Sequence, residues 1–133
     1  MTETLKTAKK PCGSCPYRRD VPSGIWAKSE YDKLPQYDGE TWQQSPKIFM
    51  CHQHDGNLCA GWLACHNPQE LLALCFGFIH NFDPMIFTYH TDVPVFISGA
   101  EARAHGLSQT KHPSVKARKM IRGLVRKRQS KGS

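Results

Sequence analysis

The sequence lacks a long apolar run, a secretory leader and any surplus of hydrophobic residues. Its longest unbroken apolar stretch, 71–79, has nine residues, whereas a membrane span needs about 20. The first ten residues contain charges but no apolar segment typical of a secretory signal peptide. We therefore expect no membrane association and a cytoplasmic location. Thiols stay reduced there, so the six cysteines indicate metal or redox chemistry more than disulfides.

The apolar content is also low for a chain of this size. The 133 residues are 39% hydrophobic, include nine prolines and have a mean hydropathy of −0.53. This composition predicts one domain with a thin core and much irregular backbone. The expected fold class is α+β: a small irregular metal-stabilised domain with a buried helix, a short strand pair and a basic C-terminal helix.

Acidic residues are nearly absent from the last quarter of the chain. Residues 99–133 contain 10 Lys/Arg and one acid, whereas residues 1–98 contain 8 Lys/Arg and 10 acids. Such asymmetry predicts a nearly neutral body with a basic appendage. We expect a disordered lead over 1–10, a Cys/His metal-binding domain over 11–112, and a basic amphipathic helix with its tail over 113–133.

Local patterns predict several short elements within this body. Helices are expected over 29–34, 68–80, 98–106 and from 113 onward, and strands over 47–50, 85–89 and 93–97. Asn67 is the predicted N-cap of helix 68–80, and Ser98 with Glu101 forms a capping box. Helix 68–80 is apolar nearly all round, so we expect it to be buried, with Cys75 as a small packing residue.

The cysteine spacing carries the clearest chemical signal. Cys12-Gly-Ser-Cys15 lies in a Pro/Gly loop, and a C-x-x-C pair can present two thiolates to one metal ion. Cys51 and Cys59 flank a second loop whose Asp-Gly-Asn sequence is typical of a turn that brings its ends together. The predicted ligand set is therefore Cys12, Cys15, Cys51 and Cys59. Sets that include His52, Cys65 or His66 are the alternatives.

Three chemistries fit these ligands. A structural Zn²⁺ would supply about 10–16 kcal/mol of apparent binding free energy to a chain with a thin core. A [4Fe-4S] cluster also uses four thiolates. A dithiol redox pair at Cys12 and Cys15 is the third interpretation, but the βαβ context typical of such pairs is missing. Zinc is the first expectation and the iron–sulfur cluster the second.

The chain also resembles a known family. The motifs are Cys-x-x-Cys-Pro-Tyr-Arg-Arg-Asp from Cys12, Phe49-x-Cys51-His52-Gln53 and Leu58-Cys59-Ala-Gly-Trp62, and the likeness covers most of 11–125. They are similar to small Cys/His-rich proteins of actinobacteria and their phages, grouped as a domain of unknown function. The resemblance implies a shared Cys/His site at the four predicted cysteines, with His52 next, and it implies no activity.

The sequence offers no catalytic motif. Cys51, His54 and Asp55 contain the residue types of a nucleophile, base and orienting acid, but no nucleophile elbow accompanies them. We therefore expect a non-enzymatic metal-binding module with no catalytic residue. It could regulate by contacting nucleic acid or a protein target; the rival class is an iron–sulfur or thiol redox protein. Cations on the C-terminal helix are the candidate phosphate contacts: Lys116, Lys119, Arg122, Arg126 and Lys127.

Overall fold

The structure, a computed structural model, describes residues 4–51, 56–75 and 81–131, with side chains as far as Arg126. In these residues it is an α+β fold with five α-helices and one three-stranded sheet. The strands are β1 (Thr4–Thr7), β2 (Asn57–Leu58) and β3 (Asn81–Phe82). The α-helices are α1 (Lys28–Asp32), α2 (Ala60–Cys65), α3 (Leu72–Cys75), α4 (Gly99–Leu107) and α5 (Val115–Lys131). The 3₁₀ turns are η1 (Leu34–Tyr37), η2 (Thr41–Gln43), η3 (Pro68–Glu70) and η4 (Pro84–Thr88).

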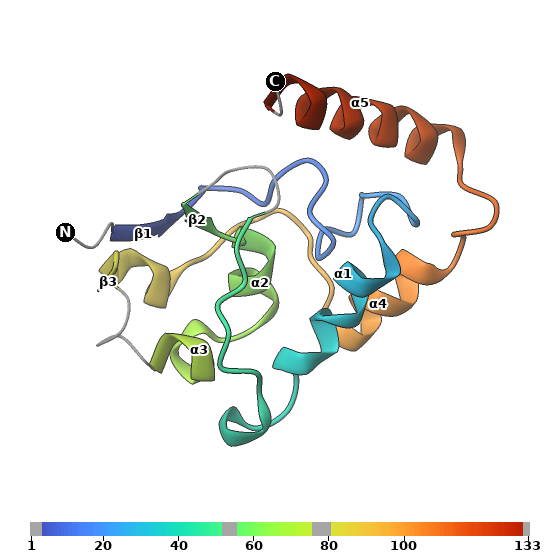
Figure 1. The fold of residues 1–133 in the computed structure, drawn as a ribbon. Helices are drawn as coiled ribbons and strands as arrows, with labels where there is room; N and C mark the ends of the chain where they lie inside the picture. Colours follow the sequence, from blue (N-terminus) through green and yellow to red (C-terminus); the bar gives the residue numbers. More distant parts are fainter. Residues whose placement is uncertain (1–3, 52–55, 76–80, 132–133) are drawn as a thin grey trace.

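The sheet lies at one end of the molecule and α4 at the other, with α2 between them (Figure 1). β1 is the central strand and pairs in parallel with both neighbours, Lys6 with Asn57 and Leu5 with Phe82. This differs from the expectations in two ways. The segment expected to be a disordered lead contains the central strand, and the expected strand pair is replaced by three parallel strands.

The predicted strands do not form. Residues 85–89 lie mostly in η4, because Asp83 accepts a hydrogen bond from the Met85 amide and Pro84 occupies the first position of the turn. Residues 93–97 and 47–50 contribute only isolated antiparallel bridges. These bridges pair Arg18 with Val95 and Met50 with Leu58.

The buried helix is α2 rather than the predicted helix over 68–80. Trp62 and Leu63 of α2 are fully buried. Residues 68–80 instead begin with η3 and α3, and 76–80 lie outside the described residues. The Asn67 cap is confirmed, since its side chain accepts a hydrogen bond from the Gln69 amide. The expectation for Cys75 is wrong: it ends α3 and is exposed.

Aromatic rings fill the core around α2. Tyr17, Tyr37 and Phe49 come from three separate segments, and each is buried. Tyr37 meets Trp62 edge-on at 5.3 Å between ring centroids, and Tyr17 meets Phe49 edge-on at 5.8 Å. Such edge-to-face pairs add to the free energy gained by burying apolar surface. They connect the irregular N-terminal segment, which contains Tyr17, to residues 49–65, which include Cys51, Cys59 and Cys65.

Helix α4 is held at its start by two caps. Ser98 Oγ accepts a hydrogen bond from the Glu101 amide, which confirms the Ser98 half of the predicted capping box, whereas the Glu101 carboxylate accepts a hydrogen bond from Arg19 Nη2. The Asp38 carboxylate also accepts hydrogen bonds from the Gly99 amide at 2.7 Å and the Ala100 amide at 2.9 Å. Asp38 thereby ties the loop after η1 to the helix through otherwise unpaired amide donors.

Replacing this carboxylate tests that link. Asp38→Ala is expected to lower the free energy of unfolding by about 1–2 kcal/mol, because two helix-terminal amides lose a charged acceptor. Urea denaturation followed by tryptophan fluorescence measures the change. The matched control is Asp92→Ala, whose side chain is fully exposed and is expected to have an effect below about 0.5 kcal/mol. Equal effects of the two substitutions would contradict the capping role.

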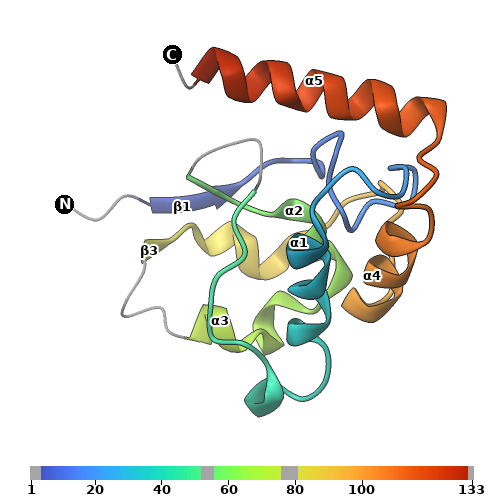
Figure 2. The ribbon, with the colours of Figure 1, turned by 45° about the vertical axis from the view of Figure 1, so that its right-hand side comes forward.

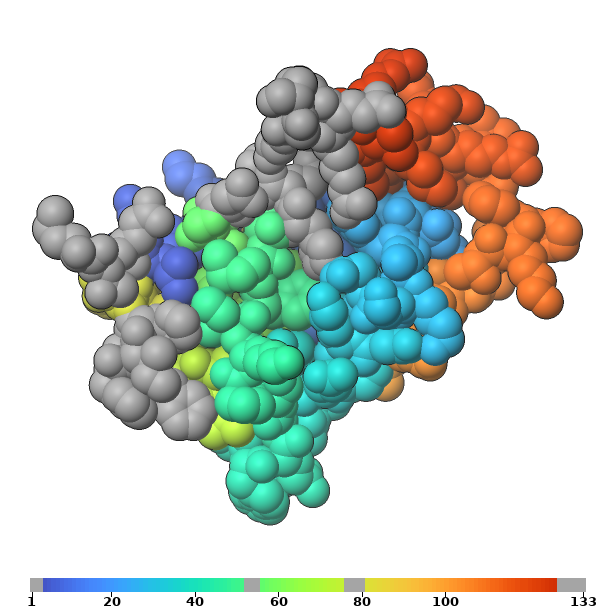
Figure 3. Space-filling model, in the orientation of Figure 1, coloured from blue at the N-terminus to red at the C-terminus, as the bar shows by residue number. Residues whose placement is uncertain are grey.

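Helix α5 lies across the N-terminal segment (Figures 1 and 2). Ser114 caps it by accepting a hydrogen bond from the Ala117 amide. Ala117 is fully buried, and partly buried Met120, Ile121 and Leu124 pack against the core. The predicted C-terminal helix is thus confirmed, and in Figure 3 it borders the blue residues of the N-terminal third. No described helix has the length and apolarity needed to cross a membrane.

Candidate metal centre

The first two cysteines lie on a tight turn. The Cys15 amide donates a hydrogen bond to the Cys12 carbonyl at 3.0 Å, and the Arg18 amide donates to the Cys15 carbonyl at 3.0 Å. These bonds fold 12–18 into two successive turns without a helix or strand. We call residues 12–15 the knuckle. Cys15 is buried and Cys12 is half-buried. The knuckle therefore places the Cys15 thiol in the interior and the Cys12 thiol nearer the protein surface.

The second two cysteines lie at the ends of a hairpin. The Cys51 amide donates to the Asn57 carbonyl at 2.8 Å, and the Cys59 amide donates to the Phe49 carbonyl at 2.9 Å. Gly56 has φ = 82°, a left-handed conformation that glycine adopts without steric cost. The predicted turn therefore returns the chain as expected, although 52–55 are outside the described residues.

The knuckle and the hairpin meet through sulfur. Cys15 Sγ lies 3.6 Å from Cys59 Sγ, and both side chains are buried. A disulfide would hold two sulfurs about 2.05 Å apart. A tetrahedral zinc ion with Zn–S bonds of about 2.3 Å would separate its sulfurs by about 3.8 Å. The measured separation is thus close to the edge of a zinc–thiolate tetrahedron and far from a disulfide bond.

The remaining two predicted thiols extend this pair. Cys12 interacts through side-chain hydrogen bonds with Cys15 and with Cys51, and the bond with Cys15 contributes most to raising the pKa of Cys12. A hydrogen bond with Cys12 lowers the pKa of Cys15. The hydrogen bond with Cys59 and burial outweigh it, so this pKa lies well above the usual range. These interactions relate the four thiols in the order Cys51, Cys12, Cys15 and Cys59, and the contact with a measured distance is that between Cys15 and Cys59.

In the described structure, the four predicted thiols do not surround a common point. Within residues 4–51, 56–75 and 81–131, no group of three or more His, Cys, Asp or Glu side chains is arranged to hold a metal ion. Cys15 and Cys59 have a sulfur separation close to that of two zinc ligands. Cys12 and Cys51 are both half-buried, which leaves their side chains room to change rotamer.

The reserve ligands lie elsewhere or outside the described residues. His52 belongs to the undescribed segment. Cys65 ends α2, and burial, followed by the charges of Asp38 and Glu101, raises its pKa to about 12. The His66 ring contacts the Tyr17 ring at 6.0 Å between centroids, and burial lowers the pKa of His66. Among the described contacts of Cys65 and His66, none joins them to the four clustered thiols.

Three residues hold the knuckle, and two of them, Trp26 and Gly61, were missed by sequence reasoning. Trp26 Nε1 donates a hydrogen bond to the Ser14 carbonyl at 2.8 Å, and Arg18 Nη1 donates to the Pro11 carbonyl at 3.0 Å. Gly61 of α2 lies so close to the knuckle that a Cβ atom there would overlap Cys15 Sγ. The sequence signal for Gly61 was the run of two small residues directly after Cys59.

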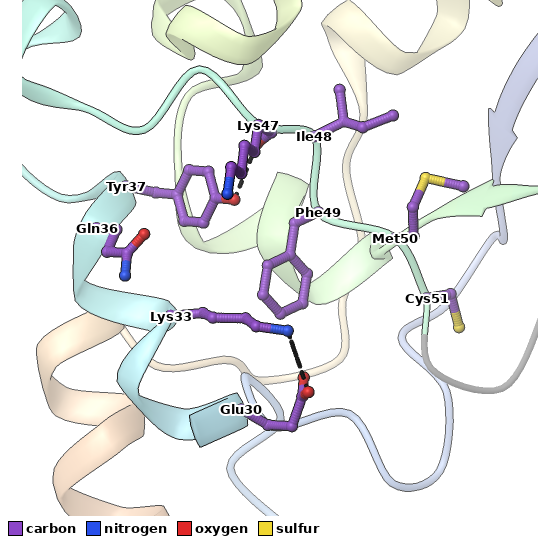
Figure 4. Close-up of a pocket in the computed structure, with 9 residues that line it drawn as sticks. All are labelled: Glu30, Lys33, Gln36, Tyr37, Lys47, Ile48, Phe49, Met50 and Cys51. Atoms are coloured by element: carbon purple, nitrogen blue, oxygen red, sulfur yellow. Dashed lines mark hydrogen bonds and ion pairs between the residues drawn. The ribbon is translucent and has the colours of Figure 1, made fainter. Parts of the chain in front are cut away.

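Cys51 also borders a pocket of about 580 Å³. Figure 4 shows Cys51 at one end of this pocket and Gln36 at the other. The Lys33–Glu30 ion pair, with Nζ and Oε1 3.0 Å apart, lies along its wall. Cys51 is therefore the member of the thiol cluster that lines an open depression, whereas Cys15 and Cys59 are enclosed by the core.

The predicted phosphate contacts lie on α5. Lys116, Lys119, Arg122 and Arg126 are all exposed. Lys116 Nζ donates a hydrogen bond to the Asp20 carbonyl at 3.0 Å, so this lysine also holds the helix against the N-terminal segment. The side chain of Lys127 lies outside the described part of the structure.

Comparisons with known proteins give one match. No curated protein and no solved structure is detectably similar to this chain. A model of a protein family described as "Family of unknown function (DUF6283)" matches residues 7–122, a range that includes the knuckle, the hairpin and all five α-helix starts. The match covers well over half of the chain, so this protein belongs to the DUF6283 family of unknown function.

Proposed function

We propose that Cys12, Cys15, Cys51 and Cys59 bind one structural Zn²⁺ and that the protein is a non-enzymatic, metal-stabilised binding module. The observation that carries this proposal is the 3.6 Å approach of Cys15 Sγ to Cys59 Sγ across two separate chain segments. A C-x-x-C turn and a hairpin, each supplying two cysteines, are a common way to build a closed four-thiolate site.

The local surroundings favour a single ion over a cluster. In a [4Fe-4S] cluster each thiolate binds a different iron, so the sulfurs are held farther apart than around one ion. The Cys15 and Cys59 sulfurs are close enough to share one ion. Cys12 and Cys51 would complete the tetrahedron by a change of side-chain rotamer, which their partial exposure permits.

A closed site of this kind is structural. Four thiolates fill the coordination shell of zinc and leave no position for water or substrate, whereas catalytic zinc sites keep one position open. A zinc–tetrathiolate centre has a net charge of −2; the Arg18 guanidinium holds the Pro11 carbonyl beside the knuckle, and its own charge is paired with the Asp20 carboxylate. The zinc site would therefore stabilise the fold, and the protein surface would bind the partner.

Metal analysis of the natively purified protein tests this proposal. We expect one zinc per chain and no colour. Cys15→Ser and Cys59→Ser should each reduce bound zinc at least tenfold, because a serine hydroxyl is a far poorer zinc ligand than a thiolate. Cys75→Ser is the matched control, since this thiol is exposed and lies on α3; it should retain one zinc per chain.

Two results would contradict the zinc assignment. Stoichiometric iron with absorption near 400 nm in anaerobically purified protein would favour the cluster instead. Full zinc content in both Cys15→Ser and Cys59→Ser would show that other residues bind the metal. Cys65→Ser separates the two predicted ligand sets, because it should retain zinc if the four clustered thiols are the ligands.

A further inference from the structure

Helix α5 has two distinct faces. Ala117, Met120, Ile121 and Leu124 lie on one side and pack against the core. Arg118, Lys119, Arg122 and Arg126 are exposed, and at 100° per residue they fall on the side opposite the packed residues. We call these four residues the cationic face. Because the apolar side packs against the core, the cationic face is the part of this helix that is accessible to a partner.

The charges of this face are not compensated within the described structure. Several cations of the body are paired, among them Lys28 with Asp32, Lys33 with Glu30, and Arg19 with Glu101. By contrast, no described ion pair involves a residue of α5. The helix sequence Val115–Lys131 itself contains no acidic residue. An unpaired row of guanidinium and ammonium groups attracts polyanions and steers their approach.

We propose that the cationic face of α5 binds the phosphate backbone of nucleic acid without sequence preference. A helix rises 1.5 Å per residue, so Arg118 and Arg126 are about 12 Å apart along the axis. Phosphates of one duplex strand follow at about 3.4 Å along the axis, so this length faces three to four of them. The exposed residues of 116–126 include no Asn or Gln, the side chains that read adenine most selectively.

The packing of α5 favours nucleic acid over a membrane surface. An interfacial helix binds lipid by burying its apolar face between headgroups and acyl chains. In this protein that face is occupied: Ala117 is fully buried, and Leu124 packs against the core. Lys116 adds a hydrogen bond to the Asp20 carbonyl that holds the helix in place. The helix can therefore present charge without releasing its apolar side.

The test is a salt titration with a fluorescein-labelled 20-base-pair DNA duplex and the full-length, metal-loaded protein. With three phosphate contacts, a plot of log Kobs against log salt should have a slope of about −2.7, so the Kd rises about 40-fold between 50 and 200 mM salt. Arg122→Ala combined with Arg126→Ala should make the slope less negative by about 2 and weaken binding at 50 mM salt at least tenfold.

The matched control is Lys28→Ala combined with Lys33→Ala, which also removes two exposed cations. These two lysines lie on or next to α1, and each forms an ion pair with a carboxylate. This variant should bind DNA within about twofold of the unmodified protein. Equal weakening by both double variants would overturn the assignment to α5, and so would salt-independent binding. Tighter binding to phosphatidylserine vesicles than to DNA would favour a membrane, and equal binding to polyglutamate would exclude phosphate recognition.

The outcome is independent of the zinc proposal. Metal content and far-UV circular dichroism are measured on the same samples. A zinc-loaded, folded protein that does not bind DNA would overturn only the nucleic-acid proposal. A metal-free protein that still shows the predicted salt slope would overturn only the zinc proposal.

Discussion

Removing the proposed zinc ion is expected to unfold this protein. The segment 8–27 contains no helix or strand, yet it supplies Tyr17 and the knuckle to the core. Its position depends on short turns, on hydrogen bonds such as that from Trp26 to the Ser14 carbonyl, and on the thiol cluster. Zinc sites of this type contribute about 10–16 kcal/mol of apparent binding free energy. The typical net stability of a domain is about 5–15 kcal/mol. Losing the zinc-binding free energy would therefore remove most or all of the net stability of this domain.

The measurement is near-UV circular dichroism and thermal unfolding before and after treatment with a strong chelator under reducing conditions. The tryptophan signal should collapse, because Trp62 is fully buried beside the site, and no cooperative transition should remain. Adding back zinc should restore both. Cys75→Ser should behave as the unmodified protein throughout. A metal-free protein with an unchanged transition temperature would show that the core is sufficient without the metal.

Gly61→Ala is expected to have the second largest effect. A Cβ atom at this position would overlap Cys15 Sγ and lie 2.8 Å from Tyr17 Cβ, and both side chains are buried. Neither can move without shifting the knuckle away from α2. Forcing a methyl group into so closely packed a site costs about 1–3 kcal/mol or more. Because the shift also separates Cys15 from Cys59, the variant should lose zinc as well as stability.

The matched control is Gly123→Ala on α5, where an added Cβ would meet no atom within 4 Å. This substitution should stabilise the protein by about 0.5–1 kcal/mol, because alanine is the better helix former. Urea denaturation gives the free energy of unfolding of both variants, and zinc analysis gives their metal content. The comparison separates the effect of a closely packed position, Gly61, from that of an open position, Gly123. A Gly61→Ala protein with full zinc content and unchanged stability would contradict the described contact between α2 and the knuckle.

Local signals in the sequence were sufficient to predict the caps, although not the length of the helix expected after Asn67. Ser98 and Asn67 cap as predicted because a side-chain oxygen needs only an amide two or three residues away. The ends of the segment between Cys51 and Cys59 meet as predicted, and in its described part Gly56 supplies the left-handed conformation. These features depend on interactions within a few residues, which a single sequence displays directly.

The parallel sheet could not be predicted from the same information. β2 and β3 have two residues each, too few to show an alternating pattern. Their partner β1 is about 50 to 80 residues away in the chain, and such pairing depends on tertiary contacts. α2 was also hidden, because its Ala-Gly-Trp-Leu-Ala-Cys sequence contains no polar face to mark a helix period.

The segment 85–89 was misassigned for a different physical reason. Met-Ile-Phe-Thr-Tyr has the β-branched and aromatic composition of a strand. Asp83 and Pro84 immediately before it start a 3₁₀ turn, because Asp83 accepts a hydrogen bond from the Met85 amide. The local hydrogen bond outweighs the weak strand preference. At the candidate metal centre, the sequence spacing predicted the four cysteines but not Gly61, whose role depends on a contact across the fold.

X-ray absorption at the zinc K-edge of the natively purified protein tests the central claim most directly. Coordination by the four clustered cysteines predicts a first shell of four sulfur atoms at about 2.3 Å, with no nitrogen or oxygen ligand. A first shell containing histidine nitrogen or water, or a protein that contains no zinc, would contradict the four-thiolate site.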